Sequence, residues 1–117
     1  MIKVLCGGRF NFPHRGHEYF LRKAKSHGDC LIVIIAHDAH NLKRETRKVM
    51  DERKKGVEAL GIADEVVIGD QKDFFKVVEK YRPQVIALGW DQKLPFPEDK
   101  IKILGINVIK IEKMPEK

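Results

Sequence analysis

The stretch CLIVIIAH, residues 30–37, is apolar on successive positions and rich in isoleucine and valine. A strand with one face in water alternates apolar and polar side chains, whereas a strand covered on both faces is apolar throughout. We therefore expect residues 30–37 to form a central strand of a sheet that carries helices on both of its faces.

Shorter apolar runs and helix-like segments alternate on either side of this strand. The remaining strands are expected at residues 2–6, 65–69, 84–89 and 106–111, with Gly7 and Gly8 ending the first. Helices are expected at residues 15–27, 51–60, 71–81 and 98–104, with Asp51 as an N-cap and Pro83 as a stop. This alternation predicts a parallel sheet with right-handed crossovers. The fold class is therefore α/β, a Rossmann-like, doubly wound sheet of about five parallel strands in a single domain spanning residues 1–117.

Two of the expected helices have a distinct apolar side. In residues 15–27 the inner face is expected to hold Tyr19, Phe20, Ala24 and His27, with Leu21 beside them. In residues 71–81 the spacing is typical of core residues at Phe74, Phe75, Val77 and Val78.

The composition narrows the classes of partner. The 117 residues carry a net charge of +6, which favours polyanionic partners: nucleotides, phosphorylated metabolites, nucleic acid or an anionic membrane surface. Residues 41–55 hold seven basic and three acidic side chains, a net charge of +4, and this segment fits either a solvated face or a phosphate-binding loop. No helix-turn-helix, RNA-recognition or zinc-finger pattern is present, so no nucleic-acid partner is expected.

The location of the protein is expected to be cytoplasmic. Cys6 and Cys30 lie in apolar runs without a C-x-x-C pattern, which is typical of two buried free thiols. The first residues lack the pattern of a signal peptide. No apolar run approaches the length of about 18 residues that a membrane span needs, so no span is expected.

Ligands of such sheets bind at the carboxyl ends of the strands, which directs attention to residues 7–17, 37–50 and 89–96. His14 and His17 flank the expected start of a helix, and their spacing places both imidazoles on one side. A helix N-terminus favours anions, and nearby glycines allow close approach. Together these groups suit phosphate oxygens and the charge that develops on an attacked phosphorus. Zinc is the other candidate ligand, but no third metal ligand is evident.

The segment GGRFNFPHRGH, residues 7–17, resembles the G-T-F-D-x-x-H-x-G-H signature of the cytidylyltransferase-like nucleotidyltransferases. The similarity continues through RKAKSHGDCLIVIIAHD (22–38), DERKKGVEALGIADEVVIG (51–69) and VIALGWDQK (85–93). The resemblance implies that an acceptor phosphate attacks the α-phosphorus of a nucleoside triphosphate and that pyrophosphate leaves. It further implies Mg²⁺ with the triphosphate and, because relatives are commonly dimers, a homodimer.

Site residues follow from the resemblance position by position. It implies catalytic roles for His14, His17, Lys43 and Arg53. It implies nucleotide binding by Gly8, Arg9, Phe10, Asn11, Gly16, Gly89, Trp90 and Asp91, with no metal ligand among them. For Trp90, stacking on a base and covering the end of the sheet are both open.

The reaction favoured here is transfer of CMP from CTP to a small phosphorylated acceptor such as glycerol 3-phosphate. LGWDQK, residues 88–93, is closer to archaeal FAD synthetase, so ATP with FMN is the alternative. The family has threonine and aspartate where this chain has Arg9 and Asn11, and IEKMPEK (111–117) lacks the family's R-T-x-G-I-S-T-like segment. A catalytically silent nucleotide-binding module therefore also stays open.

Overall fold

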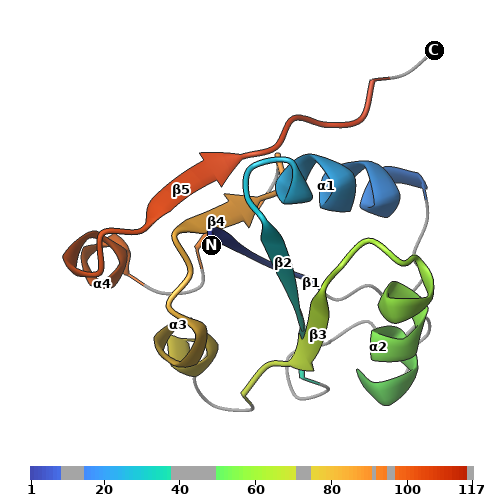
Figure 1. Ribbon diagram of the computed structural model, residues 1–117, viewed down its shortest axis with the longest axis horizontal. Coiled ribbons are helices and arrows are strands. Elements are labelled where there is room, and N and C mark those ends of the chain that lie inside the picture. Colours follow the sequence, from blue (N-terminus) through green and yellow to red (C-terminus); the bar gives the residue numbers. More distant parts are fainter. Residues whose placement is uncertain (9–14, 38–49, 71–74, 91, 95–96, 116–117) are drawn as a thin grey trace.

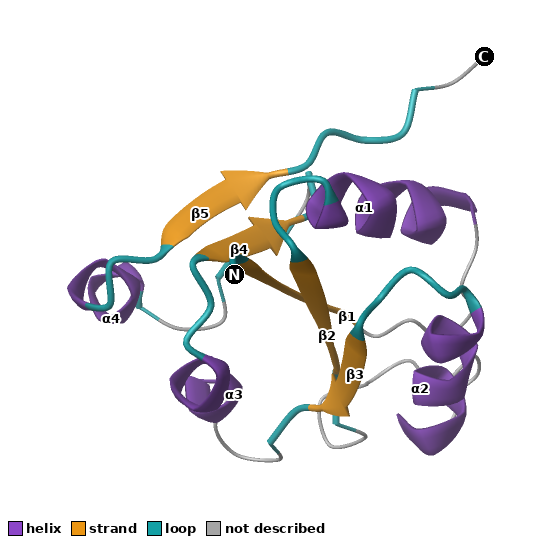
Figure 2. Ribbon diagram, viewed as in Figure 1, coloured by secondary structure: helices purple, strands orange, loops and turns teal. Residues whose placement is uncertain are grey.

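The computed structural model describes residues 1–8, 15–37, 50–70, 75–90, 92–94 and 97–115. Within these ranges, strands and helices alternate along the chain (Figures 1 and 2). They are β1 (Lys3–Gly8), α1 (Arg15–Lys25), β2 (Cys30–Ile35), α2 (Met50–Ala59), β3 (Glu65–Ile68), α3 (Phe75–Tyr81), β4 (Val85–Leu88), α4 (Glu98–Ile103) and β5 (Asn107–Lys110). The strands form a five-stranded parallel sheet in the order β3-β2-β1-β4-β5, which confirms the predicted fold class.

The sheet separates two hydrophobic clusters. Helices α1 and α2 cover one face, and α3 and α4 cover the other (Figure 1). Strand β2 supplies Leu31, Val33 and Ile35 to the first cluster and Ile32 to the second. Because successive side chains of a strand point to opposite faces, this arrangement explains why residues 30–35 are apolar at every position.

The first strand is longer than predicted, because Gly7 and Gly8 continue it instead of ending it. They pair with Ile34 and Ile35 of β2. A Cβ atom at Gly7 would lie 3.2 Å from the carbonyl oxygen of Ile34. Glycine therefore serves close approach between two strands at this position, and the prediction that it terminates β1 was wrong.

Helix α1 buries a narrower face than predicted. Leu21 and Ala24 are fully buried, and Tyr19 and Phe20 are partly buried against the same cluster. His27 is exposed and lies beyond the end of the helix, so its assignment to the inner face was wrong.

The other helices agree with the prediction apart from their ends. Helix α2 begins at Met50, so Asp51 lies in its first turn and does not cap it. In α3, Phe75, Val77 and Val78 are buried as expected, and Phe74 is outside the described residues.

Both cysteines are free thiols, as predicted, but they differ in burial. Cys6 is buried and Cys30 is partly exposed. Burial raises the pKa of the Cys6 thiol to about 12 by penalising the thiolate, so this group stays neutral near pH 7.

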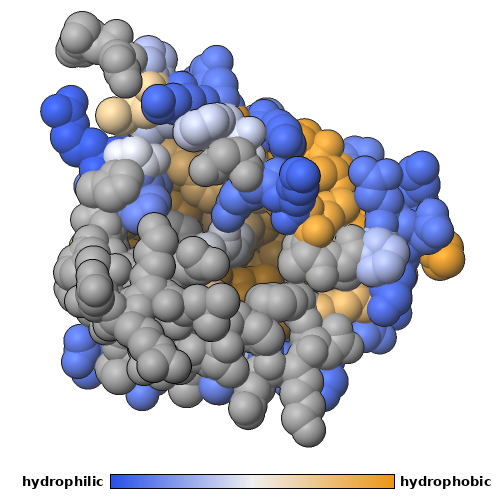
Figure 3. Space-filling model, turned by 180° about the vertical axis from the view of Figure 1, so that it is seen from behind, coloured by the Kyte–Doolittle hydropathy of each residue, from blue (hydrophilic) through white to orange (hydrophobic). Residues whose placement is uncertain are grey.

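On the face shown in Figure 3, hydrophobic areas are visible between hydrophilic side chains of the described residues. The exposed large apolar residues in the described part of the chain are the adjacent Met1 and Ile2 at the N-terminus, and Trp90, Ile103 and Val108. None of the described helices is both long and apolar enough to cross a membrane.

A hydrogen bond between α3 and β3 makes the stability of the folded protein decrease with pH in the alkaline range. The Tyr81 hydroxyl at the end of α3 donates to Oε1 of Glu65 at the start of β3, over 2.7 Å. This bond, together with burial and the charge of Glu65, raises the pKa of Tyr81 from 10.0 to about 12. Because the folded pKa is the higher one, the stabilisation is fully present below pH 10 and is lost as the pH rises toward 12.

We therefore expect the melting temperature of the wild-type protein to fall more steeply between pH 10 and 12 than that of Tyr81→Phe. Thermal denaturation followed by circular dichroism across this range measures the difference. Since all other titrating groups are shared by the two proteins, parallel pH profiles would show that the Tyr81–Glu65 bond does not contribute.

Candidate active site at the carboxyl edge of the sheet

The order of the strands reverses between β1 and β4. From β1 the chain proceeds through β2 to β3 on one side, and β4 and β5 lie on the other. Doubly wound sheets bind ligands outside the carboxyl ends of the strands at such a reversal. The ladder between β1 and β4 pairs Val4 with Val85 and Leu5 with Ile86, although β1 itself continues to Gly8 and β4 to Leu88. A gap in the strand pairing therefore lies where a ligand is expected.

The side chain of Gln92 spans this gap. Its Oε1 accepts a hydrogen bond from the Gly89 N–H over 2.7 Å, and its Nε2 donates to the Gly7 carbonyl over 3.0 Å. One amide thus satisfies a donor after β4 and an acceptor in β1. The ends of the two strands are joined through a side chain in place of a direct backbone bond.

Helix α1 begins next to this region. Gly16 and His17 lie in its first turn, and both are partly buried. The Nδ1 atom of His17 is shielded from solvent. The helix connects β1 to its parallel neighbour β2, so its N-terminus lies at the carboxyl edge of the sheet, where its dipole favours negative charge. An imidazole in the first turn of such a helix is placed to contact phosphate oxygens.

Arg53 of α2 is fully buried, which is rare for a charged side chain. Its Nη2 donates to the Ala36 carbonyl just after β2, over 2.6 Å. The Ala36 N–H donates in turn to the Gly8 carbonyl over 2.9 Å. Arg53 therefore connects α2 to the ends of β2 and β1. Its catalytic role stays a prediction, and its described contact is with the backbone that supports the site.

The segment after β5 also runs along the carboxyl edge. The Ile111 N–H donates to the Leu88 carbonyl over 2.7 Å, and the Tyr19 hydroxyl donates to Oε1 of Glu112 over 2.9 Å. The ammonium of Lys113 lies 5.3 Å from the centroid of the Trp90 ring. Trp90 is 54% exposed, so it covers little of the sheet end, and its ring already contacts a cation.

The residues predicted for the site fall into two groups. Six lie in the described part of the chain, and the structure places all of them at or behind the carboxyl edge: Gly8, Gly16, His17, Arg53, Gly89 and Trp90. The other six lie outside the described residues: Arg9, Phe10, Asn11, His14, Lys43 and Asp91.

Sequence reasoning missed Gln92 and the backbone of Ala36. Gln92 follows Gly89 by three residues in a polar loop, and no spacing rule marks a glutamine whose amide bridges two strands. Ala36 acts through its peptide groups, which leave no trace in the identity of the side chain.

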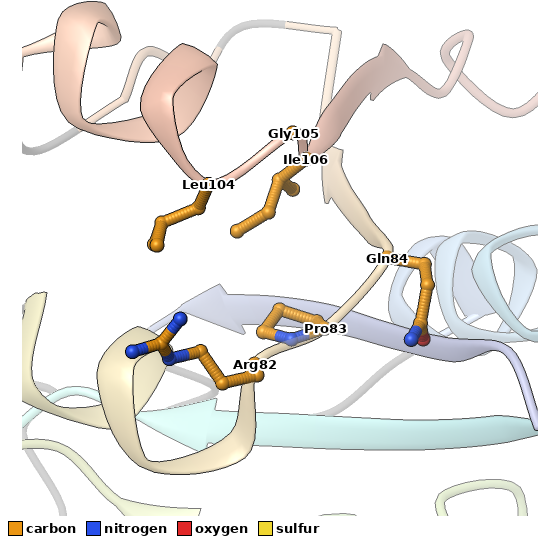
Figure 4. A pocket seen from close by; sticks show the side chains of 6 residues that line it. All are labelled: Arg82, Pro83, Gln84, Leu104, Gly105 and Ile106. Atoms are coloured by element: carbon orange, nitrogen blue, oxygen red, sulfur yellow. The ribbon is translucent and has the colours of Figure 1, made fainter.

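Two surface hollows lined by described residues lie away from the expected ligand site. One, of about 140 Å³, is formed at the amino ends of β4 and β5 by Arg82, Pro83, Gln84, Leu104, Gly105 and Ile106 (Figure 4). Another, of about 400 Å³, is lined by Arg22, Lys25, Ser26, Gly61 and Ile62 near the end of α1. Both hollows are lined by residues that come just before strands, so they lie at the amino edge of the sheet, opposite to the expected ligand site.

In the described ranges, no three His, Cys, Asp or Glu side chains form a metal-binding group.

Comparison with known proteins agrees with this geometry. A family model described as "Cytidylyltransferase-like" matches residues 5–115. The FAD synthase of Ferroglobus placidus is 47% identical over 94 residues, which cover 79% of this chain and 61% of that protein. The FAD synthase of Thermococcus sibiricus is 40% identical over 118 aligned positions, which cover 94% of this chain and 80% of that protein.

A solved structure is similar over the whole chain. The lipopolysaccharide core biosynthesis protein of Thermoplasma volcanium superposes with a TM-score of 0.82 at 31% identity, covering 100% of this chain and 99% of that one. The family match, the relatives and the similar solved structure lead to one conclusion. This chain belongs to the cytidylyltransferase-like family.

Proposed function

We propose that this chain is a nucleotidyltransferase that transfers AMP from ATP to the phosphate of FMN, as an FAD synthase does. The observation that carries the proposal is the position of His17 in the first turn of α1, the helix that connects β1 to β2 and begins at the carboxyl edge of the sheet. The relatives from Ferroglobus placidus and Thermococcus sibiricus are both named FAD synthase. They favour the ATP and FMN alternative over transfer of CMP to glycerol 3-phosphate.

In the proposed reaction an oxygen of the acceptor phosphate attacks the α-phosphorus of ATP. The new P–O bond forms as the bond to the bridging oxygen of the β-phosphate breaks, and pyrophosphate leaves with that electron pair. His17 and the N-terminus of α1 stabilise the negative charge on the α-phosphate oxygens. His14, from the same motif, is proposed as a second imidazole, and Lys43 as a contact for phosphate.

The nucleotide is proposed to lie over the gap between β1 and β4. Gly8 and Gly16 have no side chain to block a ligand, Gly89 packs against the Gln92 amide, and the half-exposed ring of Trp90 offers a face for a base. Arg9, Phe10, Asn11 and Asp91 are proposed as further contacts from the family motif. Arg53 is proposed to act on the site from behind, through Ala36.

Mg²⁺ is proposed to arrive with the triphosphate. This ion commonly keeps several waters and binds through substrate phosphates and one or two carboxylates, so it needs no dedicated cage of side chains. The ion neutralises phosphate charge when bound. The homodimer expected from the resemblance likewise stays a prediction.

A turnover assay separates the candidate reactions. The chain is incubated with Mg²⁺, ATP and FMN, and in parallel with Mg²⁺, CTP and glycerol 3-phosphate, and the products are separated by chromatography. We expect FAD and pyrophosphate from the first mixture only. Product from the second mixture would instead support transfer of CMP to glycerol 3-phosphate. Nucleotide binding without product in either mixture would support a catalytically silent nucleotide-binding module.

A further inference from the structure

The amide of Gln92 lies beyond the last paired residues of β1 and β4. It binds backbone groups that would bond to each other if the ladder continued. In the register that pairs Val4 with Val85, Gly8 would lie opposite Gly89. The Gly89 N–H would then reach the Gly7 carbonyl, as the Asn107 N–H reaches the Gln84 carbonyl in the next strand pair. Both groups instead bind Gln92, over 2.7 and 3.0 Å.

A side-chain amide can replace a peptide group in this way because it offers both a carbonyl oxygen and an N–H donor. Without it, the Gly89 N–H and the Gly7 carbonyl would either bond directly or lose their partner. A direct bond would close the gap between the strands, and an unsatisfied pair would be costly. The Gln92 amide therefore lies between the carboxyl ends of β1 and β4 and bonds to both.

The fit around the amide is close on the β4 side. A Cβ atom at Gly89 would lie 3.3 Å from Oε1 of Gln92, which is tighter than an ordinary contact. Gln92 itself is partly buried. Gly89 and the Gln92 amide are thus closely packed, and the amide links Gly89 to Gly7.

We propose that Gln92 is a positioning residue that holds open the crevice between β1 and β4 in which the nucleotide binds. This inference rests on the proposed function, because it assigns the nucleotide to that crevice. It goes beyond the family motif, since it assigns the width of the crevice to the Gln92 side chain and gives this side chain no contact with the reacting atoms.

The same strand pair offers a matched control at its other end. Oε1 of Gln84 accepts a hydrogen bond from the Lys3 N–H, also over 2.7 Å. This bond joins β1 to β4 at their amino ends, and Gln84 lines the hollow shown in Figure 4. Substitution at Gln84 removes an exposed hydrogen bond between these strands, and substitution at Gln92 removes two part-buried ones, but only Gln92 lies at the carboxyl edge.

The test compares Gln92→Ala and Gln92→Glu with Gln84→Ala and Gln84→Glu. Melting temperature is measured by circular dichroism, and the Kd of ATP with Mg²⁺ is measured by calorimetry. Gln92→Glu keeps an acceptor for Gly89 but turns an oxygen toward the Gly7 carbonyl, so it disturbs the spacing and keeps one of the two bonds. It is the second variant should Gln92→Ala fail to fold.

We expect Gln92→Ala to melt several degrees below wild type, and Gln84→Ala, which loses an exposed hydrogen bond, to melt closer to wild type. Only the Gln92 variants are expected to weaken ATP binding, by about tenfold, the size of one lost hydrogen bond. A folded Gln92 variant that binds ATP as wild type does, or Gln84 variants that weaken binding equally, would overturn the positioning role. A wild-type chain that binds no nucleotide would overturn the proposed function itself, and this inference with it.

Discussion

His17→Ala is expected to slow AMP transfer by about 10²–10³-fold, the usual cost of removing one donor that stabilises charge in a transition state. His17 lies in the first turn of α1, where the helix dipole already favours an anion. Its loss removes a contact that is strongest when charge develops on the α-phosphate. The rate of FAD formation is measured at saturating ATP and FMN, so that a change in affinity does not hide the effect on the chemical step.

His27→Ala is the matched control for this variant. His27 is exposed and follows the opposite end of the same helix. It is expected to leave both the rate and the melting temperature near wild type. A His17→Ala protein that folds and transfers AMP as fast as His27→Ala would exclude His17 from the chemistry.

Arg53→Ala is expected to lower the free energy of unfolding by about 2–4 kcal/mol, because it removes a fully buried side chain and leaves the Ala36 carbonyl without its bond. Denaturation in urea measures the change. The Ala36 N–H in turn binds the Gly8 carbonyl. Loss of the Arg53 bond is therefore expected to loosen Ala36 and, through it, the end of β1 at the site. Turnover should then fall together with the free energy of unfolding.

Lys55→Ala removes the same charge from the same helix, but Lys55 is exposed. Its effect on the free energy of unfolding is expected to stay within about 0.5 kcal/mol. Arg53→Lys is informative as well, because a lysine keeps the charge and loses the planar fork that reaches Ala36. An Arg53→Ala protein of wild-type stability that has lost its turnover would instead show that Arg53 acts on the substrate directly.

The periodicity of the sequence was sufficient to predict the fold. Residues 30–35 are apolar throughout because β2 lies between two helical layers, and few other arrangements produce that pattern in a chain of this length. The regular alternation of strands and helices then limits the topology to a parallel sheet. The expected position of the site follows from the topology, since β1 and β4 are neighbouring strands at the reversal of strand order.

The errors arose where tertiary contacts outweigh local pattern. Gly7 looks like the end of a strand, but the neighbouring strand requires it to be small. His27 continues the apolar spacing of α1, but the helix ends two residues earlier, at Lys25. The burial of Arg53 could not be predicted from the sequence either, because a basic residue in a basic segment is normally solvated.

Gln92 illustrates a second limit of sequence reasoning. Its role depends on where two strands stop pairing, and that point is set by the whole sheet. The choice between ATP and CTP is hidden for a related reason, because bases are often recognised by backbone groups in loops. Only comparison with relatives shifted the preference toward ATP.

The most direct test of the central claim is calorimetric titration with ATP and with CTP, each with Mg²⁺, of the wild type, of His17→Ala and of His27→Ala. Binding of ATP in preference to CTP, weakened in His17→Ala and unchanged in His27→Ala, is the result predicted here. Binding of neither nucleotide, or binding of ATP that does not depend on His17, would contradict a nucleotide site at the carboxyl ends of β1 and β4.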